Sequence, residues 1–294
     1  MTHSAQSRLL VTGAGGKLGR RVVELLADAG VDGCVAASRD PGKLSPPKGV
    51  EKRHADFDDP ASLDAAFKGI DRVLVISTDR IDVPGLRIKQ HRAAVDAART
   101  AGVKHILYTS MLNPEGSLIP FAPDHHTTEQ AIEQSGLDFT ILRVSWYAEN
   151  LLGSLPGVLA SGKWFTSAGN GRINYVPRED VARAAAAALA SRSGVRERLD
   201  ITGPAPLTIG QIAGIAAQIT GKRIDVVQVS DEDLANGARA AGVPEFVVPL
   251  IVGTDANIRA GKFDVASDAV ERLTGKPAQS VEAYLKANKS ALGL

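Results

Sequence analysis

Cysteine, net charge and long apolar runs are all scarce in this sequence, and each shortage excludes a class of protein. The single cysteine, Cys34, excludes an internal disulfide and leaves too few thiolates for a structural zinc site, so we expect a reduced, cytoplasmic protein without a metal. The 34 basic and 33 acidic side chains give a net charge of +1, which favours neither nucleic acid nor an anionic membrane as a partner. The apolar stretches at 184–190 and 246–253 are far shorter than the roughly 20 residues that span a bilayer.

The first 145 residues alternate short apolar runs with stretches of helical spacing. Several of the runs are apolar on both faces, which is typical of parallel strands covered by helices on two sides. The expected strands are residues 9–12, 33–37, 51–55, 73–76, 106–109 and 139–142. The expected helices are residues 17–29, 61–67, 88–101 and 124–134. This alternation predicts an α/β fold with a Rossmann-type, doubly wound parallel sheet.

The pattern changes after residue 150. Residues 180–190 are expected to form an alanine-rich helix and residues 198–202 a strand, both returning to the sheet. Residues 207–220 are expected to form an amphipathic helix in a smaller, mixed α/β C-terminal lobe. The predicted division is a first domain of residues 1–150, to which 175–203 return, and a smaller lobe of residues 151–174 and 204–294.

Glycines 13, 16 and 19 stand between the first expected strand and the helix that follows it. Glycine permits a tight turn and lets backbone N–H groups approach a pyrophosphate, and the N-terminus of the next helix favours negative charge. A glycine-rich turn without a ligand is the alternative, but the strand–turn–helix order near residue 10 favours a dinucleotide site. The residues expected to contact the dinucleotide here are Gly13, Gly15, Gly16, Lys17, Leu18 and Gly19.

Arg39 stands where an NAD-binding site carries an acidic residue, about 20 positions after the glycines at the end of the second strand. A guanidinium is always charged and suits a 2′-phosphate, so Arg39 predicts NADP(H) as the cofactor, with Lys43 as a second cation. An arginine solvated at the strand end is the alternative. Asp40, if it faced the ribose instead, would contradict this choice of cofactor.

Together with several later segments, these residues resemble the NmrA-like family of atypical short-chain dehydrogenases. The resemblance is dense up to residue 150 and weakens to scattered matches beyond it. Within the family the segments are most similar to the type 2 quinone oxidoreductases and the triphenylmethane reductases. The matching segments are residues 12–19, 37–41, 55–57, 90–91, 101–106, 108–110, 125–129, 142–143, 146–147 and 149–150.

The resemblance implies a protein of two lobes, with NADPH along the carboxyl edge of the sheet and the substrate in the cleft between the lobes. It assigns Arg39 to the 2′-phosphate. The further contacts that it implies are Asp56 and Phe57 to the adenine, Ile76, Ser77 and Thr78 to the ribose and pyrophosphate, and Thr109 and Ser110 to the nicotinamide side. The residues expected to contact the substrate are Met111, Phe121, Trp146 and Asn150.

Most short-chain dehydrogenases carry a Tyr-x-x-x-Lys pair, in which the lysine lowers the tyrosine pKa so that the tyrosine can protonate a carbonyl. Alignment puts Phe121 at the tyrosine position and His125 at the lysine position. No tyrosine lies between Tyr108 and Tyr147, so a small error of register would not restore the acid. Reduction of an ordinary carbonyl is therefore disfavoured unless Tyr147 or His125 acts as the acid. Packing near a helix start is the equal alternative for His125.

These observations predict an NADPH-dependent oxidoreductase that transfers hydride to a quinone or a similar flat, conjugated acceptor. Hydride addition to such an acceptor leaves a stabilised product, so positioning matters more than a strong acid. Trp146 and Tyr147 could stack on the acceptor or pack at the lobe junction. The alternative is a non-catalytic, NADP(H)-binding redox sensor of the NmrA type. An isoflavone-reductase-like enzyme would carry lysine in place of His125. The sequence identifies neither the natural acceptor nor the oligomeric state, including any homo-oligomer.

Overall fold

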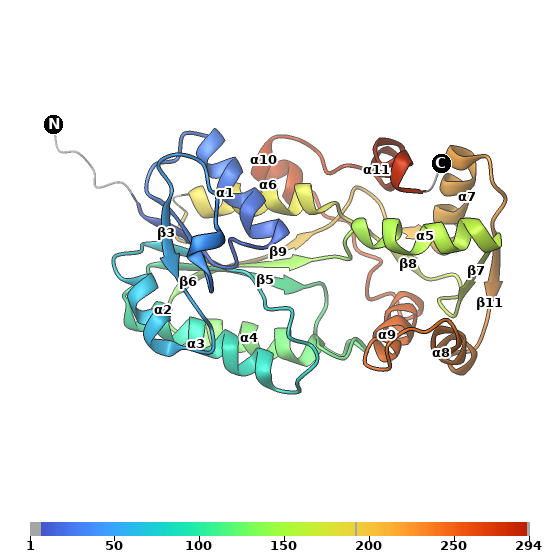
Figure 1. The fold of residues 1–294 in the computed structure, drawn as a ribbon, viewed down its shortest axis with the longest axis horizontal. Coiled ribbons are helices and arrows are strands. Elements are labelled where there is room, and N and C mark those ends of the chain that lie inside the picture. Colours follow the sequence, from blue (N-terminus) through green and yellow to red (C-terminus); the bar gives the residue numbers. More distant parts are fainter. Residues whose placement is uncertain (1–6, 192, 293–294) are drawn as a thin grey trace. The chain divides into compact units, whose positions relative to one another are not determined.

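A seven-stranded sheet is the central feature of the computed structural model, which describes residues 7–191 and 193–292 (Figure 1). Its strands lie in the order β3-β2-β1-β4-β5-β6-β9, and the pairings β1–β2, β1–β4, β2–β3 and β4–β5 are parallel. The bounds are β1 Leu9–Val11, β2 Cys34–Ser38, β3 Glu51–His54, β4 Arg72–Val75, β5 His105–Met111, β6 Asp138–Val144 and β9 Glu197–Ile201. The change of direction between β1 and β4 is the topological switch of a doubly wound sheet, and the predicted fold class is confirmed.

Helices cover both faces of this sheet. Figure 1 shows α2, α3 and α4 along one face and α1 and α6 along the other. Their bounds are α1 Lys17–Asp28, α2 Pro60–Phe67, α3 Leu86–Thr100, α4 Ala122–Gln134 and α6 Arg178–Ala190, with a short 3₁₀ helix η1 at Pro41–Lys43. A buried apolar cluster lies between the strands and the layer of α2 to α4, and includes Phe67, Tyr108 and Ile132. Two covered faces explain why the strands read as continuous apolar runs.

A buried arginine joins the amino end of β4 to the end of α6. Arg72 is 8% exposed. Its guanidinium donates to the carbonyl oxygens of Leu189 at 3.0 Å, Ala188 at 3.2 Å and Ser193 at 3.0 Å. The last carbonyls of a helix have no partner within the helix, and they carry its negative partial charge. The charge of Arg72 is therefore balanced by the end of a helix that follows it by more than a hundred residues.

The chain forms two compact units. Unit 1 comprises Met1–Met111, Asp124–Arg143 and Val181–Leu199, and unit 2 comprises Leu112–Pro123, Val144–Asp180 and Asp200–Leu294. Unit 2 thus contains four segments that the sequence prediction assigned to the first domain: residues 112–123, 144–150, 175–180 and 200–203. Hydrogen bonds between distant residues hold the first of these segments: Leu118 N donates to Asn257 Oδ1 at 2.9 Å, and Asn113 Nδ2 donates to the Lys262 carbonyl at 2.8 Å.

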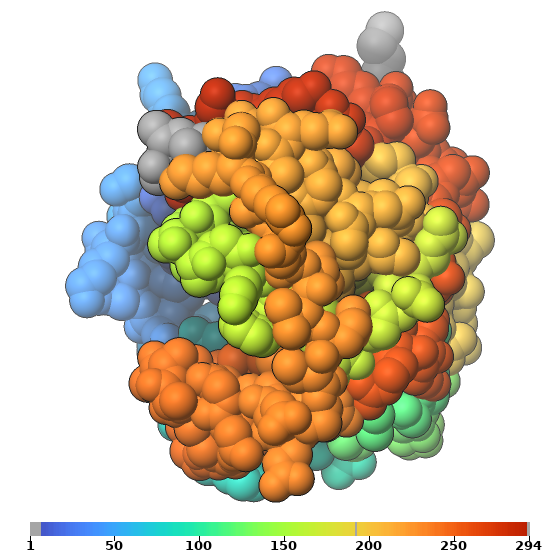
Figure 2. All heavy atoms as spheres, turned by 90° about the vertical axis from the view of Figure 1, so that its right-hand side faces the viewer, coloured from blue at the N-terminus to red at the C-terminus, as the bar shows by residue number. Residues whose placement is uncertain are grey.

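Unit 2 combines two small sheets with helices. Strand β8 pairs antiparallel with β10, and β7 pairs parallel with β11. Figure 2 shows β11 and the α8 segment, in orange, beside the yellow-green chain that includes β7. The bounds are α5 Glu149–Ser161, β7 Lys163–Thr166, β8 Arg172–Ile173, β10 Leu207–Thr208, α7 Ile209–Thr220, β11 Asp225–Gln228, α8 Asp231–Ala240, α9 Val248–Arg259, α10 Ala269–Thr274, α11 Val281–Ala287 and η2 Lys289–Leu292.

The described helices include none that is both long and apolar enough to cross a membrane. Among the same residues, no group of three or more His, Cys, Asp or Glu side chains is arranged to hold a metal ion.

Candidate functional site

The turn between β1 and α1 requires glycine at two positions for reasons internal to the fold. Gly13 has a φ of +62°, a left-handed conformation that disfavours any side chain. A Cβ on Gly19 would lie 2.4 Å from the Gly13 carbonyl oxygen, so α1 could not approach the turn as closely as it does. These two glycines explain the tight passage from strand to helix, and by themselves they do not indicate a ligand.

Gly15 and Gly16 are less constrained, because a side chain has room at Gly15 and would meet one tight backbone contact at Gly16. Gly16 has a φ of −81°, and a Cβ there would meet only the Gly13 carbonyl oxygen, at 3.3 Å. A Cβ on Gly15 would make ordinary contacts, the nearest at 3.6 Å. Both residues are exposed, and Gly16 precedes α1 without a side chain to cap the first N–H groups of the helix. Bare backbone at an uncapped helix N-terminus suits a pyrophosphate.

Two further polar groups at the carboxyl ends of the strands lack partners. Ser38 Oγ, at the end of β2, and Thr78 Oγ1, after β4, are buried and accept or donate no hydrogen bond within the described chain. Buried polar atoms are nearly always hydrogen-bonded, so each unpaired atom needs an explanation. A bound dinucleotide along this edge of the sheet would provide partners for both, and these residues therefore fit the predicted cofactor.

Arg39 follows β2 directly. It is exposed and has no hydrogen-bond or ion-pair partner among the residues that the structure describes. Asp40 instead pairs with Lys43, with 2.9 Å between Oδ2 and Nζ, and this hydrogen bond lowers the pKa of Asp40. The carboxylate that could have bound a ribose hydroxyl is thus turned to Lys43. Arg39 is therefore open to a phosphate. Lys43 forms an ion pair with Asp40, and this pair is exposed and contributes little to stability.

The loop predicted to contact adenine is fixed by its own hydrogen bonds. Asp56 Oδ1 accepts from the Asp58 N–H at 3.0 Å, and the Asp56 N–H donates to Ser62 Oγ at 2.9 Å. Phe57 is half-buried against the core cluster. The adenine contact itself stays a prediction.

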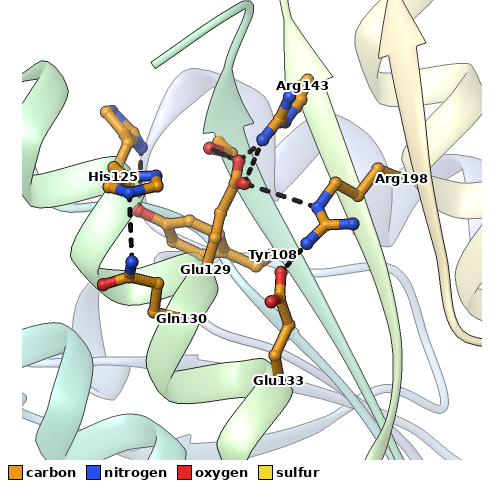
Figure 3. A network of polar contacts seen from close by, with 9 residues as sticks. Tyr108, His125, Glu129, Gln130, Glu133, Arg143 and Arg198 are labelled. Atoms are coloured by element: carbon orange, nitrogen blue, oxygen red, sulfur yellow. Dashed lines mark hydrogen bonds and ion pairs between the residues drawn. The ribbon is translucent and has the colours of Figure 1, made fainter. Parts of the chain in front are cut away.

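His125 lies inside α4, only 4% exposed, and both of its ring nitrogens have partners. Nδ1 lies 2.8 Å from the Tyr108 hydroxyl (Figure 3), and Nε2 lies 2.9 Å from Arg87 Nη2. A guanidinium only donates, so Nε2 accepts and the neutral ring carries its proton on Nδ1. Burial, followed by the charge of Arg87, holds the pKa of His125 well below its usual range. This geometry favours the packing interpretation of His125 over the role of an acid.

The end of β5 contacts a buried carboxylate. Ser110 Oγ donates to Glu129 Oε1 at 2.5 Å, and Glu129 is 2% exposed. Arg143 binds the same carboxylate through Nε at 3.0 Å and Nη2 at 2.5 Å, while Arg198 Nε lies 3.7 Å away (Figure 3). Thr109 and Met111, on either side of Ser110, are each 4% exposed. The predicted nicotinamide-side residue Ser110 is therefore oriented by Glu129, a residue that sequence reasoning did not single out.

Phe121, Trp146 and Phe263 form an aromatic surface on unit 2, which we call the Trp146 shelf. The rings of Trp146 and Phe121 are parallel within 1°, with centroids 6.4 Å apart. Trp146 also packs on Phe263, with centroids 5.5 Å apart. Phe263 is fully buried, whereas Phe121 and Trp146 are half-buried. Two of these rings were predicted to contact substrate; Phe263, distant in sequence, gave no local signal.

Tyr147 and Asn150 lie close to the shelf in the sequence. The Arg178 guanidinium lies over the Tyr147 ring, 4.9 Å from its centroid. Burial raises the pKa of Tyr147 to about 12, although Arg178 opposes the shift. Asn150, in the first turn of α5, is exposed. A tyrosine with so high a pKa is a weak proton donor at neutral pH.

Comparison with known proteins identifies the family of this chain. The family described as NAD(P)H-binding matches residues 13–192. Quinone oxidoreductase 2 of Escherichia coli is 32% identical over 92% of this chain and 94% of its own length. An NmrA-like family domain-containing oxidoreductase of Aspergillus flavus is 30% identical over 78% of this chain and 76% of its own length.

Solved structures show the same similarity. The E. coli NADPH-dependent quinone oxidoreductase complexed with NADPH has a TM-score of 0.89 at 31% identity, covering 96% of this chain and 99% of that one. Triphenylmethane reductase of Citrobacter sp., complexed with NADP(H), has a TM-score of 0.86 at 34% identity, covering 95% of this chain and 99% of that one. The chain therefore belongs to the NAD(P)H-binding, NmrA-like family of oxidoreductases, as the resemblance in its sequence predicted.

Proposed function

We propose that this protein is an NADPH-dependent oxidoreductase that passes hydride to a quinone or a similar flat, conjugated acceptor. One observation carries the proposal. At Phe121, where most short-chain dehydrogenases have their catalytic tyrosine, this chain has a ring that lies parallel to Trp146. The residue at the position of the usual acid, Phe121, thus forms part of an aromatic surface and cannot donate a proton.

The residues of the two units support different parts of this function. On unit 1, the exposed backbone at Gly15 and Gly16 suits a pyrophosphate. The exposed guanidinium of Arg39, which has no partner within residues 7–191 and 193–292, suits a 2′-phosphate. NADPH, when bound, provides the hydride. On unit 2, a flat conjugated acceptor could stack on the half-buried ring of Trp146, a contact worth about 0.5–1.5 kcal/mol beyond the area it buries.

The surroundings of His125 and Tyr147 make both side chains poor proton donors, which favours an acceptor that needs no protein acid. His125 is enclosed between Arg87 and Tyr108, and its lowered pKa keeps it neutral. Tyr147, with a pKa of about 12, holds its proton. Hydride addition to a quinone or a dye cation gives a stabilised product before any proton arrives, so these side chains can serve in binding and positioning alone. The named activities of the E. coli and Citrobacter relatives point to the same class of acceptor.

The decisive experiment follows NADPH oxidation by absorbance against a panel of quinones, triphenylmethane dyes and enones. We expect turnover with quinones or dyes and little with isolated carbonyls. Trp146→Ala should raise the KM of the best acceptor roughly two- to tenfold, because the stacking contact is lost. Trp164→Ala, a half-buried tryptophan on β7, is the matched control and should leave that KM unchanged. NADPH binding without turnover of any acceptor would refute the proposed oxidoreductase activity and favour the alternative of a non-catalytic redox sensor.

A further inference from the structure

Four polar side chains meet inside unit 1, between the sheet and its helices. Arg87 and His91 come from α3, Tyr108 from β5 and His125 from α4, and none is more than 5% exposed. The centroid of the Tyr108 ring lies 5.4 Å from that of His91 and 5.8 Å from that of His125. A cluster of this kind is costly to bury unless each polar group has a partner, so its hydrogen bonds can be followed one by one.

The first half of the cluster has a single consistent arrangement of protons. Arg87 Nη2 donates to His125 Nε2, so the neutral His125 ring has its proton on Nδ1. That Nδ1 lies 2.8 Å from the Tyr108 hydroxyl and donates to it. The positive charge of Arg87 is balanced by Asp124, with 3.4 Å between Nε and Oδ2. Arg87 therefore sets the tautomer of His125.

The second half ends on the backbone of Thr78. The Thr78 N–H donates to His91 Nε2 at 3.0 Å, so the neutral ring of His91 also carries its proton on Nδ1. This Nδ1 lies 3.0 Å from Thr128 Oγ1 and 3.3 Å from the Tyr108 hydroxyl. Thr128 Oγ1 donates in turn to the Asp124 carbonyl at 2.7 Å and so has a lone pair free to accept from His91. The Thr78 N–H thus requires Nε2 of His91 to be an acceptor, and Thr128 Oγ1 accepts the proton on Nδ1.

The neutral state of His91 persists at any ordinary pH. Burial, followed by the charge of Arg87, lowers the pKa of His91 to about 3. A protonated His91 would have a donor at Nε2 and could not accept from the Thr78 N–H.

Thr78 is the last of three consecutive residues held in the same manner. The N–H of Ile76 donates to Thr12 Oγ1 at 3.0 Å, and the N–H of Ser77 donates to Thr109 Oγ1 at 2.9 Å. The N–H of Thr78 donates to His91 Nε2. Side chains from the turn after β1, from β5 and from α3 thus anchor one short segment after β4, while Thr78 Oγ1 is buried and has no partner among the described residues. The backbone of residues 76–78 is therefore held by the protein, and the Thr78 hydroxyl is available to a ligand.

We propose that His91 is a positioning residue for the dinucleotide: it holds the Thr78 backbone so that residues 76–78 bind NADPH, although His91 itself makes no contact with the cofactor. The inference rests on the proposed function, in which this segment lines the cofactor. It adds that affinity for NADPH depends on a buried acceptor nitrogen of His91, whose tautomer is set by the hydrogen bond from its Nδ1–H to Thr128 Oγ1.

The test compares two substitutions of His91 by isothermal titration with NADPH and by urea unfolding. His91→Leu removes the acceptor and should raise the Kd for NADPH roughly five- to a hundredfold, because the Thr78 N–H is left unpaired in the interior. His91→Gln can place an amide oxygen near the position of Nε2 and should restore the Kd to within about threefold of the wild type.

His105→Leu is the matched control. His105 is 2% exposed, bonds Thr140 Oγ1 at 2.9 Å and begins β5, at the opposite edge of the sheet from its carboxyl end. This variant should lose stability without any change in the Kd. A purely structural role for His91 would make the two leucine variants alike, both less stable and both with the wild-type Kd, and that result would overturn the proposal.

If His91→Leu does not fold, Thr128→Val gives the same test by a smaller change. It removes the oxygen that receives the His91 proton and keeps the shape of the side chain. A Kd raised several-fold in Thr128→Val supports the proposal, and an unchanged Kd in that variant overturns it. Because these titrations need no acceptor, a failure to reduce any quinone would refute the proposed function and leave this result standing.

Discussion

Mild acid should destabilise this protein through three histidines that are buried in their neutral form. Burial lowers the pKa of His91 to about 3 and that of His105 to about 4, and it holds the pKa of His125 well below its usual range. In the unfolded chain each returns to about 6.5. A histidine whose folded-state pKa is lowered contributes stability that is complete above the unfolded pKa and is lost as the pH falls toward the folded one.

The size of the effect follows from the protons that the unfolded chain gains. At about pH 5.5 each unfolded-state histidine gains about 1.4 kcal/mol from protonation, so three histidines lower the free energy of unfolding by about 4 kcal/mol relative to about pH 7.5. Burial raises the pKa of Asp124 and of Asp255, and these two groups offset part of the loss because they favour the folded state at low pH. The melting temperature should fall by roughly 10 °C.

Circular dichroism melts and urea titrations at about pH 7.5, 6.5 and 5.5 would measure this loss directly. His105→Gln removes one of the three histidines and should reduce the pH dependence by about a third, whatever it does to stability at neutral pH. An identical free energy of unfolding at the highest and lowest pH would refute the reasoning, because it would mean that the unfolded state takes up no protons that the folded state excludes.

Three further variants test the cofactor and acceptor sites. Arg39→Ala should remove most of the preference for NADPH over NADH, roughly ten- to a hundredfold in affinity, whereas Lys43→Ala should change it little; equal affinities in the wild type would contradict this. Gly16→Val should abolish NADPH binding while circular dichroism still shows a folded protein, and Gly19→Val should disturb the fold itself. Binding retained in Gly16→Val would place the dinucleotide elsewhere. Tyr147→Phe should leave kcat within about twofold, since stacking does not need the hydroxyl; loss of all turnover would identify Tyr147 as a relocated acid.

The sheet and its helices could be predicted because their signals are local. Strands with two covered faces are apolar without interruption, and the predicted strand at residues 33–37 differs from Cys34–Ser38 by one residue at each end. The helix expected at residues 61–67 is found as α2, and it begins one residue earlier, at Pro60, where Asp59 accepts from the Ala61 N–H. The grouping of residues 112–123 with unit 2 had no such signal, because it depends on contacts with partners about 140 residues away.

The site divides in the same way. The glycine turn and Arg39 were evident because their spacing alone has chemical meaning. The partners of His91 and His125 come from separate elements, so each histidine had several interpretations until the fold brought them together. The sequence singled out His125 because it stands at the lysine position, yet in the fold α4 buries His125 against Tyr108 of β5. The acid roles of His125 and Tyr147, and the contacts of Asp56 and Phe57, stay predictions.

The hydrogen bonds of Arg72 limit how far the nucleotide-binding part of the protein can act alone. β4 leaves the ribosome well before the carbonyl oxygens that its arginine needs, which come 116 to 121 residues later. Until then the guanidinium must stay in water, because burying it without acceptors would cost several kcal/mol. The burial of Arg72 is thus postponed until the first two segments of unit 2, which end at Asp180, have been synthesised. A fragment that stops at residue 150 keeps the glycine turn and Arg39 but lacks the helix end that neutralises Arg72, so such a fragment leaves unit 1 itself incomplete.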